Sequence, residues 1–297
     1  MKHQKSRAAK KILALCSVYN RVKITLPGLK SLETALNLSG CDYDICIVDD
    51  GSVDGTVDVI QSNLVKAKIL RLSGGQFWAR SMRQGFNRFW DSKQYFAILV
   101  FNDDCLFKNN SITNLISKYD EVVLGGHSDL ILVGPTSDET EKNITYGGWV
   151  RRSNLFWLGL QIKKIQAGGV EADTLNMNCA LISGSVVDRY GFIDEEFIHG
   201  MADFDYGLRM TKKGVLLLVL GEYVAVCPHN STKGSWVDNS VGLIDRFKNI
   251  NNVKVLPVSQ TIFFMRRHAG LLWPLFVLYP YIKASVNWGY HKIIGAK

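Results

Sequence analysis

The sequence predicts an α/β fold with a Rossmann-like, mostly parallel central sheet flanked by helices. Four apolar runs of strand length alternate with helical patterns in the first third of the chain. Continuous apolar runs indicate strands that are buried on both faces, as in parallel sheets. Three of these runs are followed by polar clusters, so polar side chains should gather at the carboxyl edge of the sheet, where such folds bind ligands.

The elements can be justified in chain order. The run ILALCSV is apolar throughout and predicts a buried first strand. Pro27 falls in the first turn of the helix that follows, where its missing N–H costs little, and Asp54 is a suitable N-cap for the next helix. The predicted elements are strand 12–18, helix 25–37, strand 43–50, helix 55–64, strand 67–72, helix 77–90 and strand 95–101.

Charge is distributed unevenly along the 297 residues, which carry a formal charge of +8. Residues 1–11 hold five Lys and Arg without an acid, and residues 246–297 hold eight without an acid. The remaining residues, 12–245, carry 22 basic and 27 acidic side chains. We therefore predict a basic extension (1–11), an acidic central domain (12–245) and a basic helical segment (246–297). Ordinary hydrophobic and charged fractions exclude the disordered and fibrous classes.

The six cysteines include no CxxC pair, which favours a reducing cytoplasm over a disulfide framework. The basic C-terminal segment is rich in Phe, Trp and Tyr, and its longest uncharged apolar run is 269–282. That run is shorter than the roughly 20 residues that a membrane-spanning helix needs. Two interpretations stay open: the segment lies on an anionic membrane, or it packs as a helix pair on the protein's own core. The absence of acids favours the membrane.

We expect a cytoplasmic protein that is peripherally associated with the inner face of the cell membrane. Nucleic acid is not an expected partner, because the acidic body would repel phosphate backbones. A homo-oligomer is compatible with the sequence.

Polar clusters follow three of the predicted strands: SVYN at 17–20, DDGSVDGT at 49–56 and NDD at 102–104. Buried carboxylates need partners, so acids gathered at a sheet edge point to ligand binding. The P-loop and dinucleotide fingerprints are absent from the sequence. Carboxylates could instead hold a base and ribose, with Asp103 and Asp104 offering oxygen ligands to a divalent cation on the phosphates.

Four segments together resemble the family-2 inverting glycosyltransferases of the GT-A fold: SVYNR (17–21), IVDDGSVDGT (47–56), FNDDC (101–105) and ADFDYGLRM (202–210). The resemblance covers about residues 11–235 and is greatest to the bacterial surface-polysaccharide, rhamnosyltransferase-like branch. It implies transfer of a sugar from a UDP- or dTDP-sugar to a lipid-linked or surface-glycan acceptor in O-antigen or capsule biosynthesis.

The resemblance also implies that the two halves of the domain have different functions. The nucleotide-binding half would span about 12–105, and the acceptor-binding and catalytic half about 106–245. A divalent cation, Mn²⁺ or Mg²⁺, would be the cofactor, with Asp104 and His229 as its ligands. Asn102 stands where many family members have Asp, so fewer carboxylates than usual are available here. The residues implied for nucleotide binding are Ser17, Tyr19, Asn20, Asp49, Asp50, Arg80 and Asp103.

An inverting transfer needs one general base to take the proton from the attacking hydroxyl. The family's base belongs to an acidic pair at the start of a helix, and here that pair reads Ala202-Asp203, so Asp203 is the predicted base. Asp205 is the rival, but it suits a structural role in the first helical turn, pairing with Arg209 at i,i+4.

Four further residues are candidates for contacts with the donor or acceptor. Trp78 matches an aromatic element near the donor, and Trp149 could stack on a sugar face. Asn178 could bond a hydroxyl, and Lys233 could contact a phosphate. Two other function classes stay open at this point: a sugar-phosphate nucleotidyltransferase, which would require a Gly-rich phosphate loop after the first strand, and a non-catalytic membrane-binding module.

Overall fold

The computed structural model describes residues 11–64, 66–153, 159–229 and 232–294. Its first half is a parallel sheet, as the sequence predicts, and the strand order is β3-β2-β1-β4. All seven predicted elements are present, and the helix expected from residue 25 begins three residues earlier. They are β1 (Lys11–Val18), α2 (Val22–Ser39), β2 (Tyr43–Asp49), α3 (Thr56–Asn63), β3 (Lys68–Arg71), α4 (Phe77–Phe89) and β4 (Tyr95–Phe101). Of the predicted N-terminal extension, only Lys11 is described, and it belongs to β1.

The second half extends the same sheet to eight strands, in the order β11-β14-β6-β13-β4-β1-β2-β3. β13 lies antiparallel between β4 and β6, so the sheet is mixed. An apolar run is compatible with either strand direction, which is why the sequence pattern does not reveal this reversal. The added elements are α5 (Ser111–Leu124), β6 (Leu130–Val133), β11 (Val170–Glu171), β13 (Cys179–Ser183), α6 (Gly184–Tyr190), α7 (Ala202–Lys212) and β14 (Leu216–Val219).

Two small sheets border the carboxyl edge of the central one. The first has the order β5-β15-β7-β8 and places the residues after β15 beside those before β5. The second, β10-β9-β12, carries Trp149 on β9. Their bounds are β5 (Leu106–Phe107), β7 (Thr136–Ser137), β8 (Ile144–Tyr146), β9 (Gly148–Arg151), β10 (Leu160–Ile162), β12 (Thr174–Leu175) and β15 (Ala225–Val226).

The apolar core forms two layers, one on each face of the central sheet. Along β1, Leu13 and Leu15 belong to one layer and Ile12, Ala14 and Cys16 to the other, following the two-residue period of a strand. α2, α3 and α5 cover the second layer, while α4, α6, α7 and α9 contribute to the first. β1 is therefore buried on both faces, as its continuous apolar sequence requires.

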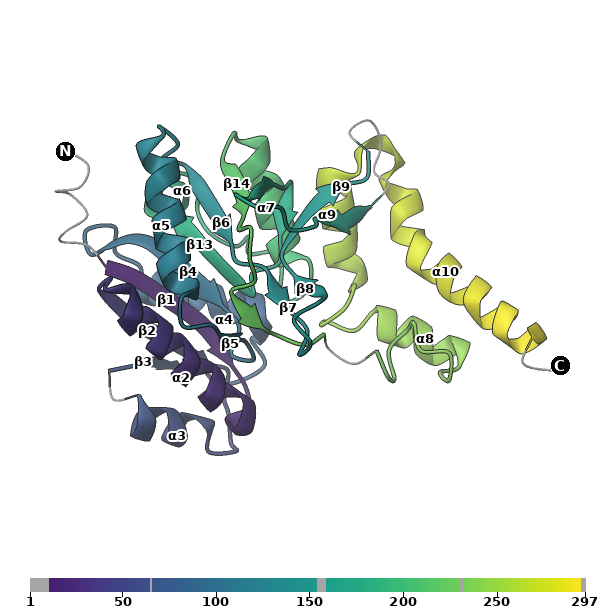
Figure 1. Ribbon diagram of the computed structural model, residues 1–297. Coiled ribbons are helices and arrows are strands. Elements are labelled where there is room, and N and C mark those ends of the chain that lie inside the picture. Colours follow the sequence, from purple (N-terminus) through teal and green to yellow (C-terminus); the bar gives the residue numbers. More distant parts are fainter. Residues whose placement is uncertain (1–10, 65, 154–158, 230–231, 295–297) are drawn as a thin grey trace.

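The C-terminal segment divides into a packed part and a projecting part. It contains α8 (Leu243–Ile250), α9 (Val258–His268), a 3₁₀ turn (Gly270–Leu272) and α10 (Trp273–Ile294). Phe264 of α9 is 3% exposed and belongs to the core. α10 projects away from the sheet (Figure 1) and contacts α8, where the rings of Phe247 and Tyr281 lie 5.4 Å apart. No helix in the described ranges is long and apolar enough to cross a membrane.

A buried ionic cluster joins α7 to α9. Asp205 is fully buried, and its carboxylate accepts hydrogen bonds from Arg209 Nε at 2.8 Å and Arg267 Nη1 at 2.9 Å. His268 Nε2 lies 2.9 Å from the same carboxylate. Burial raises the pKa of Asp205, but the bond with His268 and the two guanidinium charges outweigh burial and hold the pKa below its usual value. The predicted i,i+4 pair of Asp205 and Arg209 is confirmed.

Replacing Asp205 with Ala should lower the free energy of unfolding by about 3 kcal/mol, because the buried carboxylate that joins Arg209, Arg267 and His268 is lost, although Arg267 keeps its pair with Asp194. Chemical denaturation monitored by circular dichroism measures this change. Asp245→Ala is the matched control, since Asp245 is an exposed first-turn carboxylate of α8 and pairs with Lys248 at 3.2 Å. It should cost less than about 1 kcal/mol. Equal losses in the two variants would show that the cluster does not tie α7 to α9.

Since the folded pKa of Asp205 is depressed, its contribution is present above about pH 4 and is lost as pH falls through the folded pKa. Stability should therefore decline more steeply on acidification in the wild type than in Asp205→Asn.

Candidate functional site

The polar ends of β1, β2 and β4 border two adjoining cavities at the carboxyl edge of the sheet. The larger has a volume of about 380 Å³ and the smaller about 240 Å³. The smaller is lined by Tyr19 and Asp50, and the larger by the NDD turn and Asp203. The residues that line both are Ser17, Arg21, Trp78, His199 and Lys254.

Asp50 joins the smaller cavity to the start of α4. It is 5% exposed, and its carboxylate accepts the backbone N–H groups of Gln76 at 2.9 Å and Phe77 at 2.8 Å. The carboxylate thereby satisfies donors at the N-terminus of α4, which no intrahelical bond reaches. Tyr19 stands beside it with 49% of its surface exposed, so its ring is available to a flat ligand.

Two other residues predicted to bind the nucleotide, Asp49 and Asn20, hold the loop that follows β2. Asp49 is 2% exposed and accepts the Ser52 N–H at 3.1 Å. Asn20 adopts a positive φ of 49°, accepts the Val53 N–H at 2.8 Å and donates its own N–H to Ser52 Oγ at 2.9 Å. Asp49 and Asn20 therefore shape the loop, and neither lines the cavities.

The NDD turn is held by an arginine that sequence reasoning did not single out. Arg21 donates from Nη1 to Asp103 at 3.0 Å and from Nη2 to Asp104 at 2.8 Å. Asp103 is 2% exposed and also accepts the Thr25 hydroxyl at 2.5 Å. Burial raises the pKa of Asp103 despite the nearby guanidinium. Asp103 is thus fully engaged inside the protein, whereas Asp104 is partly exposed, with its side chain 21% accessible.

Helix α2 approaches the NDD turn so closely that only glycine fits at position 28. A Cβ atom built on Gly28 would lie 2.2 Å from the carbonyl oxygen of Asp103. Because the opposing atom belongs to the backbone, no side-chain rotation could relieve the clash. α2 therefore positions Arg21 and Thr25 directly over Asp103.

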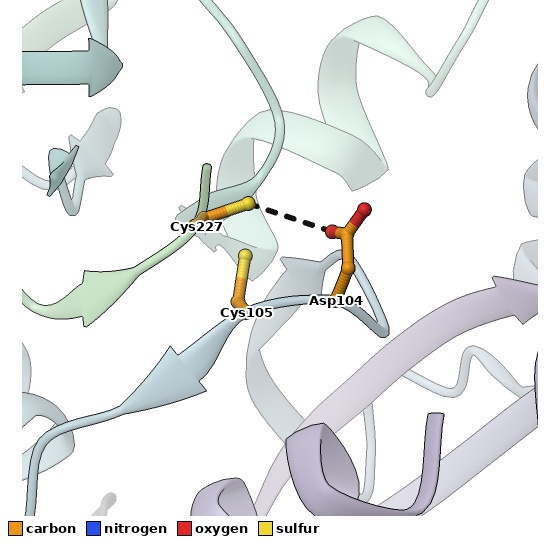
Figure 2. Close-up of side chains that lie close together, drawn as sticks. All are labelled: Asp104, Cys105 and Cys227. Carbon is orange, nitrogen blue, oxygen red and sulfur yellow. Dashed lines mark hydrogen bonds between the residues drawn. The ribbon is translucent and has the colours of Figure 1, made fainter. Parts of the chain in front are cut away.

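Two cysteines lie close to Asp104, the predicted metal ligand. Cys227 Sγ donates to Asp104 Oδ1 at 3.5 Å, and Cys105 lies beside the pair (Figure 2). Within the described ranges, Asp104, Cys105 and Cys227 form a group of potential metal ligands whose ligand atoms all lie within 4.8 Å of one another. His229 is outside that group; it is exposed, and its ring meets Tyr146 edge-on at 5.1 Å.

Asp203 lies in the first turn of α7 and faces the larger cavity. Burial raises the pKa of its carboxyl group above the usual value. Asn176 donates from Nδ2 to Asp203 Oδ2 at 3.3 Å, and Asn176 Oδ1 accepts the indole N–H of Trp149 at 2.6 Å. Trp149 is thus connected to the predicted base through Asn176, a residue that sequence reasoning did not select. Asn178, on the same segment, also lines the larger cavity.

His199 and Lys254 complete the lining from parts of the chain that carry no recognisable motif. Burial, with the charge of Lys254, lowers the pKa of His199 to about 4. His199 is therefore neutral at physiological pH. The backbone N–H of Trp78 donates to His199 Nδ1 at 3.3 Å, which leaves the proton on Nε2 as a donor. Lys254 belongs to the loop between α8 and α9, so the basic C-terminal segment contributes directly to the cavities.

The remaining predicted residues lie outside the two cavities. Arg80 and Lys233 are exposed, and the carboxylate of Asp205 is hydrogen-bonded within the cluster between α7 and α9. The predicted residues that do line the cavities are Ser17, Tyr19, Asp50, Trp78, Asp103, Asp104, Asn178 and Asp203. Proximity to Asp203 in the sequence was a usable signal for His199, whereas Lys254 offered none.

A Rossmann-like sheet with carboxylates at its carboxyl edge and a second, mixed half defines the class of GT-A glycosyltransferases. Comparison with known families agrees, because residues 16–178 match the family described as glycosyl transferase family 2. The match spans more than half of the sequence, so the chain belongs to glycosyl transferase family 2. No curated protein matches the chain.

Solved structures resemble the chain in fold. Mannosyltransferase PcManGT from Pyrobaculum calidifontis, in complex with GDP-Man and Mn²⁺, gives a TM-score of 0.57 at 11% identity, covering 95% of this chain and 75% of that one. TarS 1-349 from S. aureus gives 0.55 at 13% identity, covering 92% and 80%. Its complex with UDP-GlcNAc gives 0.54 at 14% identity, covering 92% and 81%. At such identities the likeness shows a shared GT-A-like fold alone.

Proposed function

We propose that the protein is a metal-dependent inverting glycosyltransferase that takes a UDP- or dTDP-sugar as donor. The acceptor is a lipid-linked or surface glycan in O-antigen or capsule-type biosynthesis, in the rhamnosyltransferase-like branch. One observation carries the proposal: Asp104 and Asp203 line the same cavity, which adjoins a second cavity lined by Tyr19 and Asp50. Structural neighbours hold GDP-Man or UDP-GlcNAc, which supports a nucleotide-sugar donor here.

Asp203 is the proposed base that accepts the proton of the attacking hydroxyl. Its pKa is raised by burial, which brings it nearer to the operating pH and makes the carboxylate a stronger base. The bond from Asn176 fixes the orientation of one carboxylate oxygen. The rival carboxylate, Asp205, is fully buried and bonded to its cationic partners, so it cannot reach an acceptor.

Positive charge for the leaving diphosphate comes from two sources in the chain. Arg21 and Lys254 line both cavities and are placed to stabilise developing negative charge. A divalent cation, when bound, would neutralise the diphosphate as a Lewis acid. The partly exposed carboxylate of Asp104 fits such an ion, whereas buried Asp103 is engaged by Thr25 and Arg21. His229, being exposed nearby, remains a candidate ligand, with Lys233 a candidate phosphate contact on the same loop.

The outer face of α10 is proposed to lie on the inner leaflet of the cell membrane. Its exposed apolar residues recur every three or four positions, which gathers them into one stripe along the helix. The opposite face packs on the body through Trp273 and Phe276, and on α8 through Tyr281. The stripe consists of Leu275, Leu278, Tyr279, Ile282, Val286 and Tyr290, and exposed Leu271 precedes it on the 3₁₀ turn. The exposed Lys248, Arg266 and Lys283 lie in a stretch without acidic residues (246–297) and complement anionic lipids.

Nucleotide binding tests the proposal before any acceptor is known. UDP or dTDP with Mn²⁺ should raise the melting temperature, because a ligand that binds only the folded state stabilises it, by about 2.7 kcal/mol at 100 times Kd. Tyr19→Ala should weaken the effect, while Tyr279→Ala removes an equally exposed ring on α10 and should not. If no nucleoside diphosphate raises the melting temperature, the proposed function is wrong.

Asp203→Asn should lower turnover by about 10²–10⁴-fold while leaving the nucleotide-induced melting shift unchanged, because the amide keeps the shape but accepts no proton. In the wild type, turnover should fall on acidification through the raised pKa of Asp203, and the residual activity of Asp203→Asn should lack that step. Transfer from a panel of nucleotide-sugars provides the assay. Asp245→Asn alters a first-turn carboxylate of α8 and should behave as wild type; near-normal turnover of Asp203→Asn would exclude this base.

Substituting Leu278, Ile282 and Val286 with Ser should reduce binding to anionic vesicles at least about tenfold, since three half-exposed apolar side chains lose their burial in lipid. Cosedimentation with phosphatidylglycerol vesicles measures it. The matched control places Ser at Leu38, Val53 and Leu124, which are apolar, lie outside α10 and are exposed at 60%, 89% and 75%. Equal binding of the two triple variants would contradict the assignment of α10.

A further inference from the structure

The thiol of Cys227 lies beside the carboxylate that faces the proposed diphosphate position, and no step of the proposed reaction uses it. β15 ends at Val226 and pairs with β5, opposite Leu106. This pairing carries Cys227 to the NDD turn, although 122 positions separate it from Cys105. Cys227 is 1% exposed, so its position is set by packing as well as by pairing. The fold thus brings a sulfur atom to the carboxylate Asp104 (Figure 2).

The distance between the two potential ligand atoms is the one a single ion would require. Asp104 Oδ1 and Cys227 Sγ are 3.5 Å apart. Zinc-type ions bind carboxylate oxygen at about 2.1 Å and thiolate sulfur at about 2.3 Å, and a tetrahedral angle between such bonds separates the two atoms by about 3.6 Å. An ion could therefore be accepted between them with little movement of the chain.

The carboxylate of Asp104 is already divided between two partners. Oδ2 pairs with Arg21 Nη2 at 2.8 Å, while Oδ1 faces Cys227. An ion on Oδ1 would leave the ion pair with Arg21 intact, so the guanidinium would orient the ligand as outer-shell partners of metal sites do. Cys105 is fully buried beside Cys227, and its thiol donates to the Asn178 carbonyl oxygen at 3.5 Å. Asn178 Nδ2 in turn lies 3.6 Å from Cys227 Sγ.

We propose that Asp104 Oδ1 and Cys227 Sγ are both ligands of the divalent cation, with Cys105 beside the sulfur. On binding, the Cys227 thiol loses its proton to solvent and the sulfur coordinates as a thiolate. A thiolate favours Zn²⁺, Cd²⁺ or Co²⁺ over Mg²⁺, which prefers oxygen ligands alone. The ion's role in transfer rests on the proposed function, but its ligation is a property of the folded chain that can be measured without turnover.

Cadmium reports directly on sulfur ligation. Titration of the full chain with Cd²⁺ should produce a thiolate-to-metal charge-transfer band in the ultraviolet that saturates at one ion per chain. Cys227→Ser should abolish that band and weaken Cd²⁺ binding at least about tenfold. Cys41→Ser is the control, because Cys41 is only half-buried and precedes β2, at the opposite edge of the sheet. An unchanged band in Cys227→Ser would overturn the proposal.

Two further variants keep the test decisive if Cys227→Ser folds poorly. Asp104→Asn preserves the shape of a partly exposed side chain and should also weaken Cd²⁺ binding at least about tenfold. Cys227→Asp replaces sulfur by oxygen, so affinity for Cd²⁺ should fall while affinity for Mg²⁺ rises. Parallel changes for the two ions would contradict sulfur ligation.

The nucleotide-induced melting shift, measured on the same proteins, separates this inference from the proposed function. If the wild type binds Cd²⁺ through Cys227 but no nucleotide raises its melting temperature, the metal site is supported and the proposed glycosyltransferase function is contradicted.

Discussion

The cost of burying carboxylates at one edge of the sheet determines the geometry around the cavities. Asp49, Asp50 and Asp103 are 2%, 5% and 2% exposed, and a buried charge is tolerated only when it is paired or hydrogen-bonded. Backbone N–H groups satisfy the first two, and a guanidinium and a hydroxyl satisfy the third. Each requirement fixes a loop or a helix start. The acidic motifs therefore build the site as well as line it.

Asp104 and Asp203 are not fully occupied by such structural contacts, and these are the two carboxylates with a proposed chemical role. Asp104 keeps one oxygen toward Cys227, and Asp203 is held only by a long bond from Asn176 and by backbone groups. The acids at this edge that have structural roles therefore differ from those with proposed chemical roles in the hydrogen-bond partners of their carboxylates. Asp205 illustrates the contrast, since it lies two residues from Asp203 yet has every oxygen occupied.

The sequence allowed the parallel half of the sheet to be predicted, because each strand there is a local apolar run followed by a helical pattern. It also predicted the pair of Asp205 and Arg209, whose spacing is local. It did not reveal Arg21 on the NDD turn, Cys227 beside Asp104 or Lys254 at the cavities. These contacts join residues far apart in the chain, and a lone Arg, Cys or Lys carries no periodicity that marks its partner. The antiparallel β13 was missed for a related reason, since an apolar run does not encode direction.

The cluster around Asp205 also gives the C-terminal segment a mechanical connection to the proposed base. Asp203 and Asp205 lie on α7, and Asp205 is bonded to Arg267 and His268 at the end of α9. A single 3₁₀ turn separates α9 from α10, whose apolar stripe faces outward. If α10 lies on the membrane as proposed, this connection would fix the orientation of the Asp203 cavity relative to the membrane surface, from which a lipid-linked acceptor would approach.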